Sequence, residues 1–153
     1  MNIMHLDEFY LIGLAMSTKT SNENGQSSID CENLWHEFHK QKYADKIMDK
    51  LSDDIYGAYF DYDGDSTKPF NYFIGYKVKK DSVVPTGLQS LIIPQGKYEK
   101  VTAKGKMPEC VIKAWKQIWE SPLQRAYKYD FEIYDERSKN WEEAEVEVFV
   151  SIK

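Results

Sequence analysis

The sequence predicts an α+β fold built from a duplicated strand-helix-strand-strand unit with pseudo-two-fold symmetry. Segments with strand-like and helix-like periodicity follow that order twice along the chain. Two short stretches also match between the halves. Leu34-Trp35 corresponds to Ala114-Trp115 in the second expected helix, and Phe60-Asp61-Tyr62-Asp63 resembles Glu132-Ile133-Tyr134-Asp135. Two related units packed side by side leave a crevice where they meet, which is a favoured place for a ligand.

The size and composition of the chain fit this architecture. At 153 residues, of which 42% are hydrophobic, the sequence predicts a single domain over residues 1–153 with its own core. The two repeats are expected at about residues 9–79 and 87–153. Aromatic residues make up 14% of the chain, and such side chains suit cores, interfaces and ligand pockets.

The first repeat is expected to open with an apolar strand over residues 9–16. After a polar loop, Asp30 is a candidate N-cap for a helix over about residues 31–51. Two strands over residues 55–62 and 70–79 then form a hairpin around an Asp-Gly turn. Helical spacing is partly kept by the apolar residues Leu34, Trp35, Phe38, Ile47 and Leu51.

The second repeat follows the same order. Its first strand runs through residues 91–93, is interrupted at residues 94–96 and then resumes, which predicts a bulge or bend at an edge. Pro108 suits the first position of a helix that ends near Glu120. Two strands, over residues 129–134 and 143–152, complete the unit.

The strand over residues 129–134 carries the most informative candidate residue. Side chains alternate along a strand, so Asp130, Glu132 and Tyr134 share one face and the residues between them share the other. One of these faces should point into the protein. If it is the face of Glu132, a carboxylate lies among aromatic rings and needs a partner, and a ligand cation is one candidate.

Composition and motifs argue against several classes of function. The net charge of −5 disfavours direct nucleic-acid binding. No stretch reaches the length of a membrane span, and two separated cysteines suit a reduced, cytoplasmic protein. No cofactor is expected, because no glycine-rich phosphate loop is present. No metal is expected either, because His36 and His39 lack a third ligand at a useful spacing.

Several motifs taken together resemble the gyrase-inhibitor-like, or bacterial effector-binding, domain family. This module forms the C-terminal part of many AraC-type and MerR-type multidrug-responsive regulators and also occurs alone. The resemblance extends from about Phe9 to Lys153 and rests on the order and spacing of the motifs. They are Phe9-Tyr10-Leu11-Ile12-Gly13-Leu14, Asn33-Leu34-Trp35, Tyr56-Gly57-Ala58-Tyr59, Ile93-Pro94-Gln95-Gly96-Lys97-Tyr98, Ala114-Trp115-Lys116-Gln117-Ile118-Trp119 and Phe131-Glu132-Ile133-Tyr134.

The resemblance implies an antiparallel sheet that forms a floor, with two helices flanking a central groove. Ligands of the family are often aromatic or lipophilic cations, and a glutamate on the floor supplies the counter-charge. That glutamate corresponds to Glu132. The candidate ligand-binding residues are therefore Glu132, Trp35, Trp115, Tyr134, Tyr59, Tyr72 and Trp119.

Three functions stay open for a stand-alone member of this kind. The first is capture of a hydrophobic, cationic small molecule over Glu132, as a sensor or sequestering protein. The second is hydrolysis of a reactive electrophile, such as a cyclopropane-bearing natural product, with Glu132 as general base and Tyr134 as acid. The third is a protein-interaction role such as gyrase inhibition. No helix-turn-helix precedes Phe9, so no direct nucleic-acid partner is expected. No membrane partner is expected either, because no apolar stretch is long enough to span one, and a regulator or gyrase partner stays open.

Overall fold

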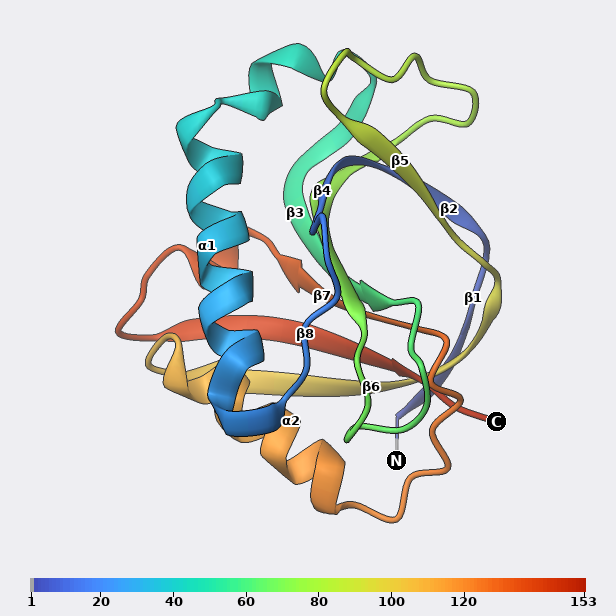
Figure 1. Cartoon of the computed structure of the whole chain (residues 1–153), viewed down its shortest axis with the longest axis vertical. Coiled ribbons are helices and arrows are strands. Elements are labelled where there is room, and N and C mark those ends of the chain that lie inside the picture. Colours follow the sequence, from blue (N-terminus) through green and yellow to red (C-terminus); the bar gives the residue numbers. More distant parts are fainter. Residues whose placement is uncertain (1) are drawn as a thin grey trace.

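An eight-stranded antiparallel sheet, curled into a half-barrel, forms the body of the molecule (Figure 1). The computed structural model describes residues 2–153. The helices are α1 (Gln26–Lys40) and α2 (Glu109–Glu120), with the short 3-10 turns η1 (Glu23–Gly25), η2 (Tyr43–Lys46) and η3 (Glu136–Ser138). The strands are β1 (Ile3–Leu6), β2 (Phe9–Ala15), β3 (Lys50–Phe60), β4 (Asn71–Val78), β5 (Gln89–Ile93), β6 (Gly96–Gly105), β7 (Tyr129–Tyr134) and β8 (Ala144–Ser151).

The order of the strands confirms the predicted fold class. Across the sheet they run β1-β6-β8-β7-β3-β4-β2-β5, and every pairing is antiparallel. The β7–β3 pair lies at the centre, with β6, β8 and α2 on one side of it and β4, β2 and α1 on the other. Each half therefore contains a strand, a helix and two strands in that chain order. The exact limits of the repeats, residues 9–79 and 87–153, stay a prediction.

The two outer strands are exchanged between the halves. β5 directly precedes β6 in the chain but pairs with β2, whereas β1 directly precedes β2 but pairs with β6. The interruption at residues 94–96 is therefore a corner between strands with different partners. The sequence predicted a bulge or bend within a single strand, whereas the structure has two strands on either side of the interruption, because proline and glycine can end a strand as well as bend it. β1 was not predicted from the sequence.

The first helix begins and ends earlier than the sequence predicted. It starts at Gln26, after Gly25, whose φ is +70°, so Asp30 lies inside the helix and is not its N-cap. It stops at Lys40 because Lys42 adopts a left-handed conformation, a common way for a helix to terminate. Leu51 accordingly lies in β3, and Ile47 reaches the core from outside the helix.

Both faces of the central sheet are buried. On the face away from the helices, Phe131 packs in an aromatic cluster with Phe9, Tyr98 and Phe149. On the other face α1 packs against β2 and β4, and α2 covers β6 and β8. The sequence predicted that one face of β7 points into the protein, but both faces do. Phe131 on one face and Glu132 on the other are each only 1% exposed. The curled sheet is thus packed on one side by its own aromatic rings and on the other by two helices.

Candidate functional site

The carboxylate of Glu132 lies at the centre of the sheet on the side covered by the helices. β7 carries it between β3 and β8, where Glu132 stands opposite Gly57 on one neighbour and Val148 on the other. Only 1% of its surface is exposed, although glutamate is rarely buried to this extent without a partner. The surrounding side chains therefore decide what this carboxylate can do.

Four aromatic side chains donate hydrogen bonds to Glu132. The hydroxyls of Tyr72 and Tyr134 donate to Oε1 at 3.2 and 2.8 Å. The hydroxyl of Tyr59 and the indole N–H of Trp115 donate to Oε2 at 2.8 and 2.6 Å. A carboxylate offers about four acceptor positions, so this cluster uses them all. The donors come from β3, β4, β7 and α2.

Trp35 of α1 adds a second layer to this group. Its indole N–H donates to the Tyr72 hydroxyl at 3.2 Å, and its ring meets that of Tyr134 edge to face, with centroids 4.9 Å apart. His39, one turn further along α1, stacks on Trp35. The aromatic side chains over Glu132 are thus supported by both helices. We call Glu132 with Trp35, Tyr59, Tyr72, Trp115 and Tyr134 the aromatic acid site.

The structure brings six of the seven candidate side chains together in the aromatic acid site. Their role in binding a ligand stays a prediction. Trp119 lies apart from them: it is 43% exposed on α2. Tyr56 lies on the opposite face of β3 and packs beside Phe9 and Phe131, as the strand alternation requires.

Gly57 is a member of the site that sequence reasoning missed. A Cβ atom at this position would lie 2.1 Å from the Tyr72 hydroxyl and 3.1 Å from Glu132 Oε1. Only a residue without a side chain therefore leaves room for the hydrogen bond between Tyr72 and Glu132. The available signal was a glycine inside a strand, which often marks a close approach of other atoms to the backbone.

The substitution Gly57→Ala is expected to lower the free energy of unfolding by about 1–3 kcal/mol. The new methyl group displaces the Tyr72 hydroxyl and leaves one position on a buried carboxylate unsatisfied. Chemical denaturation measures this loss. The matched control is Gly96→Ala in β6, where the added Cβ would meet Tyr98 at an ordinary 3.7 Å. Equal effects at the two glycines would contradict the role given to Gly57.

Burial controls the protonation of the aromatic acid site. Desolvation raises the pKa of Glu132 above its usual 4.5, while the hydrogen bonds from Trp115, Tyr134, Tyr59 and Tyr72 oppose that rise. Desolvation also raises the pKa of each of the three tyrosines well above 10, and the nearby carboxylate adds to the effect. The site thus holds one titratable acid among hydroxyls that stay protonated.

A second buried polar network adjoins the site and was not predicted. Asp130, on the same face of β7 as Glu132, pairs with Arg125 at 2.8 Å and is fully buried. Tyr62 and Ser151 also hydrogen-bond to its carboxylate. The Arg125 guanidinium lies 5.7 Å from the ring centroid of Trp115, so this ion pair packs against one of the donors to Glu132.

A curled antiparallel sheet with two helices on one face is the fold of effector-binding domains related to transcription regulators. The chain matches the Cass2 family, described as integron-associated effector binding proteins, over residues 2–152, and it belongs to that family. This match confirms the resemblance to effector-binding domains that the motifs indicated.

Individual relatives agree with this assignment. YobU of Bacillus subtilis (strain 168), whose name marks it as a candidate transcriptional regulator, is 26% identical over 156 residues, covering 99% of this chain and 97% of YobU. An integron cassette protein from the mobile metagenome of Vibrio cholerae is 28% identical, with a TM-score of 0.75 over 99% of this chain and 95% of that protein. SAV2435, solved bound to tetraphenylphosphonium, shares the fold at 16% identity, with a TM-score of 0.79 and coverage of 99% and 93%.

The helices of the described part, residues 2–153, include none that is both long enough and apolar enough to cross a membrane.

Proposed function

We propose that the protein captures a lipophilic organic cation, with Glu132 as the counter-charge. The observation that carries this proposal is one buried carboxylate enclosed by aromatic rings, with no cationic side chain among its hydrogen-bond partners in residues 2–153. Aromatic faces attract organic cations by roughly 0.5–2 kcal/mol each. A ligand cation would supply the charge partner that the protein itself does not provide.

The family assignment supports the same ligand class. The chain belongs to a family of effector-binding proteins, and a protein with the same fold was solved with the lipophilic cation tetraphenylphosphonium. That ligand has four aromatic rings around a single positive charge, which matches a site with several rings and a single acid. Tetraphenylphosphonium is therefore the probe of choice for this chain.

Binding requires the aromatic side chains over Glu132 to move, because they fill every acceptor position of the carboxylate. We expect α1 to move more readily than α2. Over its fifteen residues α1 buries only Leu34 and Phe38, whereas the twelve residues of α2 bury five. Segments with few buried apolar side chains open at lower cost. Displacing Trp35 with α1 would expose the rings of Tyr72 and Tyr134 to the ligand.

Binding fits the geometry better than hydrolysis. Hydrolysis would need a proton donor beside Glu132, and the candidate for that role is Tyr134, which hydrogen-bonds to the carboxylate. Tyr134 is a poor acid because burial and the adjacent carboxylate raise its pKa well above 10. The same features suit a site that holds a ligand until the ligand leaves unchanged.

Calorimetric titration of the whole chain with tetraphenylphosphonium tests the proposal. We expect saturable binding of one cation per chain. Triphenylphosphine oxide, which is aromatic but uncharged, is the matched control and should bind at least about tenfold more weakly, since it gains nothing from the carboxylate. Equal affinities for the two compounds, or no binding of the cation, would contradict the assignment.

The affinity for tetraphenylphosphonium is expected to fall as the pH is lowered. A cation favours ionised Glu132, and burial raises the pKa of this group above 4.5 in the free protein. Protons therefore compete with the ligand at a pH where an ordinary exposed glutamate is still ionised. Titrations from pH 8 down to about pH 4.5, the usual pKa of glutamate, should show a rising dissociation constant. A curve that stays flat over this whole range would mean that Glu132 is not the competing group.

A further inference from the structure

A pocket lies away from the aromatic acid site, at one end of the sheet. It has a volume of about 380 Å³ and is formed by the corner between β5 and β6, the segment before β7 and the end of β8. The buried ring of Tyr98 belongs to the aromatic cluster on the sheet face away from the helices, and Tyr129 packs against that cluster. The pocket therefore borders the opposite face from Glu132.

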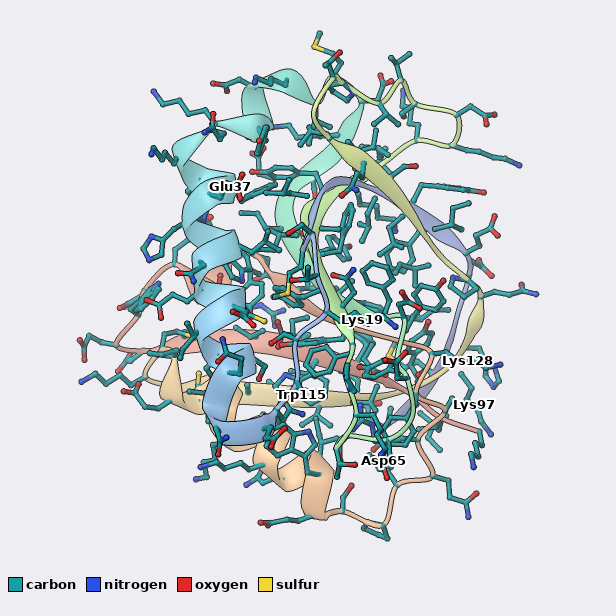
Figure 2. The ribbon with its side chains drawn as sticks, viewed as in Figure 1. Lys19, Glu37, Asp65, Lys97, Trp115 and Lys128 are labelled. Atoms are coloured by element: carbon teal, nitrogen blue, oxygen red, sulfur yellow. The ribbon has the colours of Figure 1, made fainter. Side chains whose placement is uncertain are left out.

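Basic side chains dominate the charge of this pocket. Lys97, Lys128 and Lys153 line it, and no aspartate or glutamate of residues 2–153 does. Figure 2 shows Lys97 and Lys128 near each other on the side of the molecule away from α1. Within the same residues, none of the three amines lies within 4.0 Å of a side-chain carboxylate. The whole chain has a net charge of −5, so the positive charge of this pocket is opposite in sign to that of the molecule and attracts anions.

Aromatic and apolar groups form the rest of the wall. Tyr98 is 2% exposed and packs on Phe131 with centroids 5.4 Å apart, and Tyr129 stacks on Phe60. Pro94 and Ile152 add apolar surface. A volume of 380 Å³ falls within the usual range for small-molecule sites, which are mostly apolar with a few polar groups that orient the ligand.

We propose that this pocket binds a small organic anion with an aromatic or apolar body, such as an aromatic carboxylate or sulfonate. The lysine amines hold the anionic group, and the body lies against Tyr129, Pro94 and Ile152. The site is separate from the aromatic acid site, so the protein would carry one site for each sign of ligand charge.

Fluorescence titration of the full chain with 8-anilino-1-naphthalenesulfonate tests this proposal. We expect saturable binding of one probe per chain, weakened about tenfold in the double variant Lys97→Gln/Lys128→Gln and weakened further by added salt. The matched control is Lys79→Gln/Lys80→Gln, which removes the same charge from two exposed lysines in the loop after β4. The control should keep the affinity of the unmodified protein.

Two further variants show whether the probe occupies this pocket. Ala126→Leu fills the pocket without changing charge and should also weaken binding. Glu132→Gln should leave the probe's affinity unchanged, whatever its effect on cations. The proposal is overturned if both lysine double variants lose affinity equally, if the unmodified protein shows no saturable binding, or if only Glu132→Gln alters binding.

Discussion

Replacing Glu132 by glutamine is expected to weaken tetraphenylphosphonium binding roughly 30-fold to 4000-fold. Truncating or neutralising one partner of a buried charge pair costs about 2–5 kcal/mol, and each 1.4 kcal/mol is a factor of ten. Glutamine keeps the shape of the side chain, so the loss measures the charge. Calorimetry or tryptophan fluorescence can follow it, because Trp35 and Trp115 belong to the aromatic acid site.

Two controls make this result specific. Glu99→Gln makes the same chemical change at another buried glutamate, in β6, and should leave cation affinity unchanged.

A melting curve of Glu132→Gln checks folding. Because the pKa of Glu132 is raised in the folded state, its ionisation costs stability as the pH rises from about 4.5 through the folded pKa. Glutamine does not ionise, so the Glu132→Gln protein should not lose stability over this pH range. Unchanged affinity in a folded Glu132→Gln protein would remove the carboxylate from the binding site.

The largest effect on stability is expected from Asp130→Ala, at about 3–5 kcal/mol. This change leaves Arg125 buried, 6% exposed, without its carboxylate partner, and an unpaired buried charge is costly. Urea denaturation measures the difference. Glu145→Gln, which breaks partly exposed ion pairs with Arg137 and Lys104, is the control and should cost less than about 1 kcal/mol.

A double variant separates the charge from the packing. In Asp130→Asn/Arg125→Met both charges are gone and the volumes are nearly kept. The asparagine amide can still hydrogen-bond to Tyr62 and Ser151, and methionine leaves no buried charge without a partner, so most of the lost stability should return. If the double variant is as unstable as Asp130→Ala, packing and not the ion pair accounts for the effect.

Local patterns made β7 and its carboxylate predictable. Alternation over residues 129–134 matches the observed strand, and it places Tyr134 on the same face as Glu132. The paired tryptophans of the two helices were visible because helical spacing and sequence similarity both mark them. These features depend on a few neighbouring residues, and such features can be read from one sequence.

Features that depend on distant parts of the chain were not predictable. Nothing near residues 94–96 tells whether the next strand keeps its partner, because that depends on where β1 and β2 lie. Arg125 lies in a segment without regular structure, and only the completed fold brings it to Asp130. The four hydrogen bonds donated to Glu132 likewise depend on strands and a helix that come from both halves of the chain.

Under the proposed function, the pairing of Gly57 with Glu132 across the central strands would set the charge of the ligand that the site accepts. The two halves meet here, and facing residues on antiparallel strands lie about 5 Å apart. Two acids at that separation would repel each other, and one would hold a proton. With glycine in one half and glutamate in the other, the site carries a single negative charge. Monovalent cations are therefore matched in charge, whereas a divalent one would bring an unneutralised charge out of water.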